Sequence, residues 1–142
     1  MHTSLLAAAM GLCVALMSAC PTATGTDANT IVIGAVVDRT GTNSSPSWSD
    51  AMVLAESHWN QALLDAQHRN LQFKLILQDS SQNPGVAVPR AIDVVHNSGA
   101  EALISDSSQN DIAINSLRYD DDPSNDLDVP IQCSSCTAGS VN

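Results

Sequence analysis

Two cysteines near the end of the sequence have a spacing that could support chemistry. Cys133 and Cys136 are separated by two serines in a protein of 142 residues. A C-x-x-C pair that follows a strand could act as a redox dithiol, and in an exported protein it could equally form a local disulfide or two buried thiols. No Trp precedes the pair and the region has no Gly-Pro, so a thiol-disulfide redox function is kept as the alternative.

Other patterns typical of catalysis or metal binding are missing from the sequence. His58, His68 and His96 show no ligand spacing with the cysteines, which argues against a zinc site. The aspartates between positions 120 and 128 lack the Gly and the terminal Glu of a calcium-binding loop. No nucleophile elbow and no phosphate-binding glycine loop is present. We therefore expect no enzymatic activity, no cofactor and no metal.

Loops rich in Ser, Thr and Asn are the better candidates for function. They lie at Asp38–Ser47, at Asp106–Asn110 and after a strand that begins near Val129. Hydroxyl groups and backbone N–H groups at helix N-termini suit a small anionic or zwitterionic ligand. The alternative for any single residue is that it only forms the turn.

The elements that must position these loops begin with a strand at Ile31–Val37, an apolar run typical of a strand buried on both faces of a parallel sheet. Ser47 is expected to cap a helix that runs to about Gln67. Its predicted apolar face comprises Met52, Ala55, Trp59, Ala62, Leu63 and Ala66. The alternating pattern of Leu71–Leu77 then indicates a strand at the sheet edge.

The second half of the chain continues the alternation of strands and helices. Asn83 is expected to cap a helix that has Pro84 in its first position and ends at Gly99. Pro89 predicts either a kink or a regular part that begins near this residue. The remaining elements are a strand at Glu101–Ser105, a short helix at Ile112–Leu117, an acidic irregular segment at Tyr119–Asp128 and a strand beginning at Val129–Gln132.

This order predicts an α/β fold, a doubly wound parallel sheet with right-handed crossovers. If the second strand is an edge, the strand order is 2-1-3-4, and the chain reverses direction between the first and third strands. Ligands bind in the crevice at such a switch point, beyond the carboxyl ends of the strands. The polar loops therefore face the expected binding site.

The N-terminal segment predicts export. Leu5–Leu16 is an apolar stretch too short to span a bilayer. It runs into Met17-Ser-Ala-Cys20, which resembles a bacterial lipobox, although Met17 stands where Leu is usual and no Lys or Arg precedes the stretch. We expect residues 1–19 to be a lipoprotein signal peptide and Cys20 to carry the lipid anchor, with a soluble secreted form as the alternative. Residues 20–29 are expected to form a flexible tether.

Composition limits the possible partners. Fifteen acidic and five basic residues give a formal charge of −10, which argues against a nucleic-acid partner because phosphate binding requires clustered Lys and Arg. The apolar content of 44% is enough for a packed core. The length favours one domain, at residues 30–142.

Four motifs together resemble the amino-terminal lobe of type I periplasmic binding proteins, in the branch that includes branched-chain amino-acid-binding proteins of ABC transporters. They are Ile31-Val-Ile-Gly-Ala-Val-Val with the following Thr-Gly, Gln78-Asp-Ser-Ser-Gln-Asn-Pro, Ala102-Leu-Ile-Ser-Asp-Ser-Ser and Val129-Pro-Ile-Gln-Cys-Ser-Ser-Cys-Thr. The resemblance covers about Thr30 to Thr137. A preceding lipobox also fits this family.

The resemblance implies roles for particular residues. Ser107 and Ser108 would bind a ligand carboxylate, and the loop after the fourth strand would contact the carboxylate and the ammonium group. The residues implied in that loop are Ser134, Ser135 and Thr137, although the C-x-x-C insertion departs from the family pattern. Arg39 and Thr40 would shape the wall of the cleft, whereas Asp79 is expected to be structural.

The resemblance also implies a function. Members of this family bind a small polar solute, such as an amino acid, between two lobes and deliver it to an ABC permease or a sensory partner. A chain of 142 residues matches only part of the first lobe, so we expect a fragment of a longer protein with weak or absent ligand binding by itself.

Overall fold

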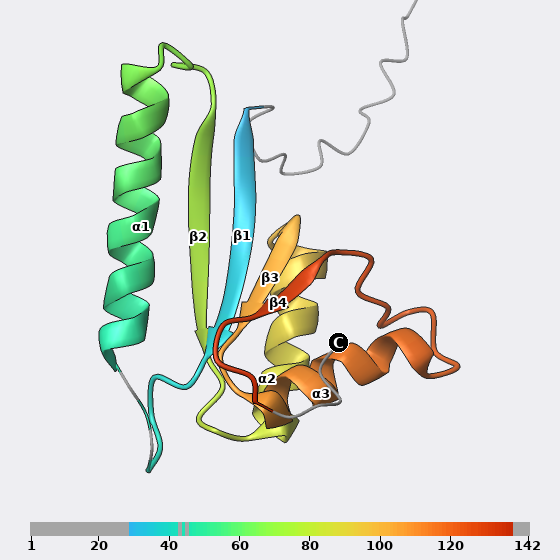
Figure 1. Ribbon diagram of the computed structural model, residues 1–142. Helices are drawn as coiled ribbons and strands as arrows, with labels where there is room; N and C mark the ends of the chain where they lie inside the picture. The colour runs from blue at the N-terminus through green and yellow to red at the C-terminus, as the bar shows by residue number, and fades with distance from the viewer. Residues whose placement is uncertain (1–28, 43, 45, 138–142) are drawn as a thin grey trace, which may run out of the picture.

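The computed structural model describes residues 29–42, 44 and 46–137. The predicted signal peptide, Cys20 with its predicted lipid anchor, and the predicted tether up to residue 28 lie outside these residues. The elements are β1 (Thr30–Val37), α1 (Pro46–Asp65), β2 (Gln72–Asp79), α2 (Pro84–Ile92), a π-helical turn (Asp93–Asn97), β3 (Ala102–Ser105), α3 (Ser108–Ser116), a 3-10 turn (Leu117–Tyr119) and β4 (Ile131–Cys133) (Figure 1).

The strands form one parallel sheet with the predicted order. The order is β2-β1-β3-β4, and all three strand pairs are parallel. β1 therefore lies between β2 and β3, and the chain reverses direction at this point, as expected. The carboxyl ends of the strands share one edge, at the bottom of Figure 1. The α/β fold class and the strand order are both confirmed.

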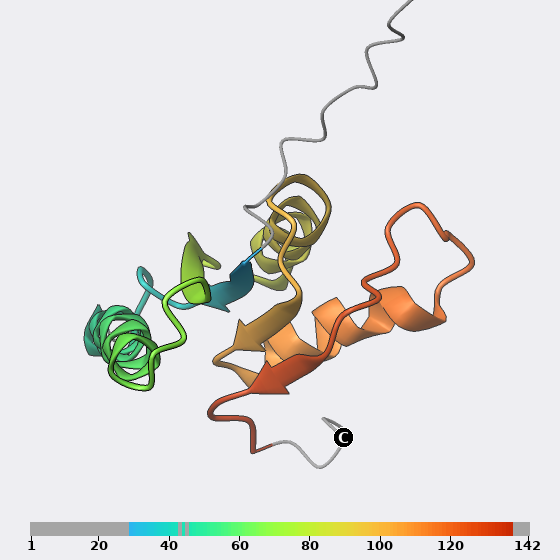
Figure 2. The same ribbon diagram turned by 90° about the horizontal axis from the view of Figure 1, so that it is seen from above.

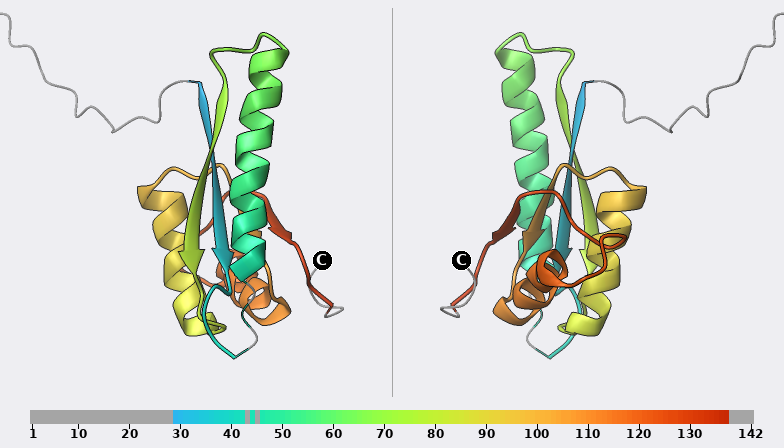
Figure 3. Two further views of the ribbon diagram at one scale, coloured as in Figure 1. Left: turned by 90° about the vertical axis from the view of Figure 1, so that its left-hand side faces the viewer. Right: turned by 90° about the vertical axis from the view of Figure 1, so that its right-hand side faces the viewer.

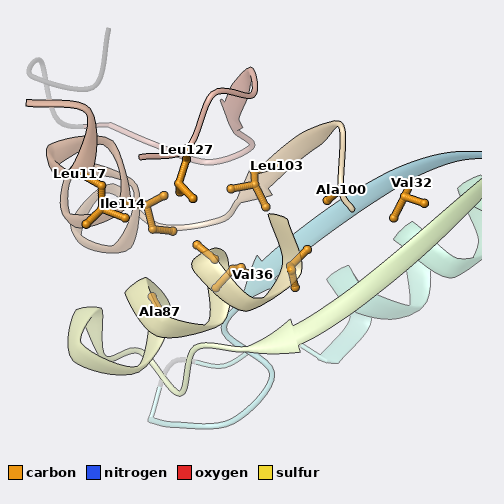
Figure 4. Close-up of a cluster of buried hydrophobic side chains, with 10 residues drawn as sticks. Val32, Val36, Ala87, Ala100, Leu103, Ile114, Leu117 and Leu127 are labelled. Carbon is orange, nitrogen blue, oxygen red and sulfur yellow. The ribbon is translucent and has the colours of Figure 1, made fainter. Parts of the chain in front are cut away.

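Helices cover the two faces of the sheet unequally. α2 and α3 share one face, and α1 lies on the other face against β2 (Figures 2 and 3). The main core is on the α2–α3 face and includes Val32 and Val36 of β1 and Leu103 of β3 (Figure 4). The other core members are Ala87, Ala91, Val94, Ala100, Ile114, Leu117 and Leu127. As composition suggests, this core is aliphatic.

Gly34 allows close contact between the central strand and the segment after α2. A Cβ atom at position 34 would lie 2.2 Å from Val94 Cγ1 and 2.7 Å from Leu103 Cδ2. Both distances are far below van der Waals contact, and both neighbours are buried. The absence of a side chain at this position therefore determines how closely the π-helical turn packs on the sheet.

α2 begins as predicted, but its irregularity is elsewhere. The Asn83 side chain accepts a hydrogen bond from the Gly85 amide at 2.9 Å, and Pro84 occupies the first helical turn. The helix runs from Pro84 to Ile92 and includes Pro89, so its regular part does not begin at this proline. Pro89 is exposed, so its position on the solvent side accommodates the missing backbone donor. The irregular turn comes later, at Asp93–Asn97, before Gly99 at a φ of 70°.

α1 differs from its prediction at its start and in its burial. It begins at Pro46, so Ser47 lies inside the helix and not at its cap. Proline is favoured in the first turn of a helix because its missing N–H has no intrahelical partner there. α1 contacts β2, but most of the predicted apolar face is exposed, including Trp59 at 62%, and Ala66 lies beyond the end of the helix. Ser49 is the only buried residue that the described helix shows. No helix in the described part of the chain is long and apolar enough to cross a bilayer.

A wide apolar groove accompanies this loose packing. It has a volume of about 330 Å³ between α1 and the open face of the sheet. Its lining comprises Ile33, Met52, Ala55, Glu56, Trp59, Phe73, Lys74, Leu75 and Ile104. The Trp59 and Phe73 rings meet edge to face with centroids 6.0 Å apart. Apart from Glu56 and Lys74, the groove offers hydrocarbon and aromatic surface.

α3 begins earlier than the sequence predicts. Positions 106–110 were expected to form a loop, but the helix starts at Ser108. Ser107 is the N-cap, and its hydroxyl accepts from the Asn110 amide at 3.5 Å. Serine at the N-cap, with Asp111 in the first turn, is favourable because both complement the unpaired amides of a helix start. The polar residues therefore serve as helix-initiating residues and the connection after β3 is short.

Candidate functional site

A polar pocket lies at the carboxyl edge of the sheet, where the loops after the strands converge. Its volume is about 490 Å³. It is lined by Asp38, Trp48, Gln82, Asp106, Ser107, Ser108, Gln109 and Ser135. These residues follow β1, β2, β3 and β4, so every strand of the sheet contributes its following segment to the pocket. This is the switch point at which α/β sheets bind ligands.

Asp38 connects the segments that form the pocket. Its Oδ1 accepts hydrogen bonds from the Gln82 amide at 3.0 Å, from Asn110 Nδ2 at 2.9 Å and from the Ser80 hydroxyl. Its own amide donates to Asp106 Oδ2 at 2.6 Å. One residue therefore links the segments after β1, β2 and β3, and the carboxyl edge of the sheet is held together before any ligand binds.

Asp106 lies in the pocket with a raised pKa. Partial burial raises the pKa of Asp106, and the negative charge of Asp38 raises it further. The hydrogen bond from the Asp38 amide acts in the opposite direction and lowers the pKa. Among the described residues, Asp106 Oδ1 and Asn110 Oδ1 are buried oxygens without a hydrogen-bond partner. Asn110 itself is fully buried, with 0% of its surface exposed. Unpaired buried acceptors are unfavourable, so these two oxygens carry an uncompensated cost of desolvation.

Asp79 has a structural role next to the pocket. Its Oδ1 accepts from the amides of Arg39 at 3.0 Å, Thr40 at 3.2 Å and Ser81 at 3.0 Å, and its Oδ2 accepts from the Thr40 hydroxyl at 2.6 Å. Partial burial opposes ionisation, but the hydrogen bonds from the Thr40 hydroxyl and these amides outweigh it and lower the pKa of Asp79 to about 2. Asp79 therefore holds the loop after β1 against the end of β2.

The loop after β4 is hydrogen-bonded to the start of α3. Ser134 donates to the Ser105 carbonyl from its amide at 2.8 Å and from its hydroxyl at 3.0 Å. The Ser135 hydroxyl donates to the Asp106 carbonyl. The Thr137 amide donates to the Ser108 hydroxyl at 3.0 Å. Of the predicted ligand-binding residues, Thr137 and Ser108 thus contact each other, whereas Ser134 and Ser135 contact the backbone at the end of β3.

The structure brings some of the predicted site residues together and leaves others apart. Ser107, Ser108 and Ser135 line the pocket. Ser134 and Thr137 are joined to this wall by the hydrogen bonds above but do not line the pocket. Arg39 and Thr40 are exposed in the loop after β1, outside the lining. The role of all seven in ligand binding remains a prediction.

Sequence reasoning did not single out the acidic and amide side chains of the pocket. Asp38, Asp106 and Asn110 lay within the predicted loops but were not proposed as site residues. A signal was available, because Asp38 directly follows β1 and Asp106 directly follows β3. The carboxyl ends of neighbouring parallel strands meet at one edge, so these two acids were bound to be close.

The two cysteines form a disulfide. Cys133 and Cys136 are bonded, with Cα atoms 5.6 Å apart. Their sulfur atoms and a carboxylate oxygen of Asp111 lie within 4.8 Å of one another. Asp111 is buried and accepts from the Ser105 hydroxyl at 2.5 Å. In this state the sulfurs are bonded to each other and are not available as thiolate ligands, and the bond closes the loop after β4.

Comparison with known proteins identifies the fold. No protein-family model matches the sequence, and no curated protein matches it. Among solved structures, a periplasmic binding protein from Burkholderia mallei matches 80% of this chain with a TM-score of 0.55 at 12% identity. A possible leucine/isoleucine/valine-binding protein from Rhodopirellula baltica matches 68% with a TM-score of 0.54 at 16% identity.

A third structure belongs to the same group. It is the branched-chain amino acid transporter substrate-binding protein of Streptococcus pneumoniae in complex with isoleucine, which matches 79% of this chain with a TM-score of 0.53 at 18% identity. The chain spans 28%, 26% and 30% of these three proteins, respectively. The fold is therefore that of type I periplasmic binding proteins, and the chain corresponds to part of one lobe. The resemblance inferred from the motifs is confirmed for the fold.

Proposed function

We propose that this chain is part of the first lobe of an extracytoplasmic solute-binding protein of an ABC-type uptake system. The observation that carries this proposal is the polar pocket at the switch point, to which the segments after all the strands contribute. The lobe would bind one side of a small polar solute, such as an amino acid, and a second lobe would cover the other side. Binding without catalysis is the proposed activity.

The hydrogen-bond network supports a binding role. Asp38 joins the segments after β1, β2 and β3, and Ser134 and Ser135 join the segment after β4 to the end of β3. A site that is organised before binding loses less conformational freedom when the ligand arrives. In the proposal, Ser107, Ser108 and Ser135 contact the solute directly. The residues assigned supporting contacts are Ser134, Thr137, Arg39 and Thr40.

The similar structures also support a role in solute binding. Two of the three are named as binding proteins for branched-chain amino acids, one of them in complex with isoleucine, and the third as a periplasmic binding protein. Export, lipid anchoring at Cys20 and delivery to a permease belong to the proposal. A sensory partner in place of the permease is the second candidate. The thiol-disulfide alternative at Cys133 and Cys136 gains no support from these proteins.

Titration followed by ¹H–¹⁵N NMR tests the proposal. A panel of amino acids and other small polar solutes is added to the 142-residue chain. Because one lobe covers one side of a ligand, we expect dissociation constants in the millimolar range, with shifts at the amides of Ser107, Ser108 and Ser135. Shifts confined to the apolar groove beside α1, or no shift with any solute, would contradict the proposal. A micromolar constant would contradict the need for a second lobe.

A further inference from the structure

The lining of the polar pocket is rich in hydrogen-bond acceptors. Asp38 and Asp106 contribute carboxylates, and no Lys, Arg or His is present among the lining residues that the structure describes. The Ser135 hydroxyl already donates its hydrogen to the Asp106 carbonyl. It can therefore offer only lone pairs to a ligand.

One further acceptor belongs to Asn110, which does not line the pocket. Asn110 is fully buried, and its Nδ2 donates to Asp38 Oδ1 at 2.9 Å. Its Oδ1 has no hydrogen-bond partner among the described residues. Asp106 Oδ1 is also unpartnered, while its Oδ2 accepts from the Asp38 amide. The orphaned acceptors and the carboxylates thus form one electronegative cluster.

The N-terminus of α3 would favour the opposite ligand charge, because the start of a helix attracts anions. Its effect corresponds to roughly half a positive charge. Asp106 directly precedes the N-cap Ser107 and can carry a full negative charge at the same place. The Ser107 hydroxyl and carbonyl also occupy the Asn110 and Asp111 amides. Asp106 and Asp38 therefore oppose the positive end of this helix.

We propose that this lobe receives a positively charged nitrogen group of its solute, an ammonium or guanidinium, and not a carboxylate. The inference rests on the proposed solute-binding function and names the solute class. An ammonium group has three donors and no acceptor. It suits the carboxylates of Asp38 and Asp106, in a lining that also contains Trp48, Gln82 and Gln109. This polarity is opposite to the carboxylate contact that the resemblance implies for Ser107 and Ser108.

Three small molecules that share a hydroxyethyl group test whether the lobe binds an ammonium group or a carboxylate. They are serine, ethanolamine, which lacks the carboxylate, and 3-hydroxypropanoate, which lacks the ammonium group. Each is titrated into the 142-residue chain up to about 100 mM at constant ionic strength and followed by NMR. We expect ethanolamine to bind at least about tenfold more tightly than 3-hydroxypropanoate, with shifts at the Asp106, Ser107 and Asn110 amides.

A matched pair of variants tests whether Asp106 is responsible. Asp106→Asn removes the charge but keeps an oxygen that can accept from the Asp38 amide. Asp128→Asn changes net charge equally at an exposed position outside the pocket. We expect ethanolamine binding to weaken about tenfold in Asp106→Asn and to stay unchanged in Asp128→Asn. If Asp106→Asn does not fold, the comparison of the three probes on the unmodified chain decides the question.

The outcomes distinguish this inference from the proposed function. Equal or tighter binding of 3-hydroxypropanoate, or equal effects of the two variants on ethanolamine, would overturn the cationic assignment and leave solute binding intact. The absence of shifts with all three probes would overturn the proposed function and this inference together. Preferential ethanolamine binding that depends on Asp106 would support both.

Discussion

Replacing Asp79 with Asn should destabilise the fold in a pH-dependent way. The carboxylate accepts hydrogen bonds from the amides of Arg39, Thr40 and Ser81 and from the Thr40 hydroxyl. Asparagine keeps one acceptor oxygen but presents an NH₂ group in place of the other. The variant therefore removes the negative charge that these donors stabilise and leaves some of them without an acceptor.

The magnitude follows from the pKa of Asp79. A fall from the ordinary value of 3.8 to about 2 corresponds to roughly 2.4 kcal/mol, at 1.36 kcal/mol per pKa unit. The loop is partly exposed to solvent, which screens such interactions. After this discount we expect Asp79→Asn to lower the free energy of unfolding by about 1 to 1.5 kcal/mol at pH 7.

The direction of the pH dependence also follows. The pKa of Asp79 is lower in the folded state than in the unfolded state, so its contribution is complete above the unfolded value. It is lost as the pH falls from about 4 towards about 2, where the folded-state carboxylate takes up a proton. The difference in stability between wild type and Asp79→Asn should therefore shrink across this window.

Urea denaturation followed by far-UV circular dichroism measures both effects. Curves are recorded at pH 7, 4 and 3 for wild type, Asp79→Asn and the exposed control Asp128→Asn. The control should stay within about 0.5 kcal/mol of wild type, as surface substitutions usually do. Equal stability of wild type and Asp79→Asn at pH 7, or a difference that is constant between pH 7 and pH 3, would refute the reasoning.

Three further substitutions test packing, capping and the disulfide, each by urea denaturation. Gly34→Ala should lower the free energy of unfolding by about 3 kcal/mol because its Cβ would lie 2.2 Å from Val94 Cγ1. The control Gly85→Ala, in the exposed first turn of α2, should change it by less than about 1 kcal/mol. Similar losses in the two variants would refute the packing argument. Asn83→Ala should cost about 1 kcal/mol by removing the α2 cap, and an unchanged midpoint would contradict that role. Cys133→Ser should cost up to about 2 kcal/mol by opening a short loop, with no further loss when reductant is added.

The sheet was predictable because its signals are local. The apolar run at Ile31–Val37 and the alternation at Leu71–Leu77 differ in pattern, and this difference separates a central strand from an edge strand. The Asn83-Pro84 cap is likewise encoded in adjacent residues. The start of α3 was placed too late because Ser107 and Asn110 resemble both a loop and a capped helix. Hydrogen bonding to the end of β3 and the loop after β4 decides between the two.

The site was only partly predictable because its contacts are long-range. The loops were identified from composition, but Asp38 binds Asp106 and Asn110 at sequence separations of 68 and 72 residues. The strand order places Asp38 near Asp106, but no pattern of adjacent residues shows which groups form the hydrogen bonds. The weak burial of α1 has a similar origin, since an apolar stripe shows which side of a helix can be buried and not how much surface faces it. Trp59 lies on that stripe and is still 62% exposed.

The position of β1 in both the chain and the sheet has a consequence for folding. β1 is the first strand described, yet it pairs with β2, whose residue Gln72 lies 42 positions after Thr30, and with β3, which comes later still. Every strand pair in this sheet encloses intervening chain, so no hairpin can form locally and native pairing depends on long loop closures. Chains of this kind fold slowly and expose apolar strands in the meantime. The most apolar strand of the sheet, Thr30–Val37, is thus unpaired until distant parts of the chain reach it. This segment is therefore the one most exposed to aggregation before folding is complete.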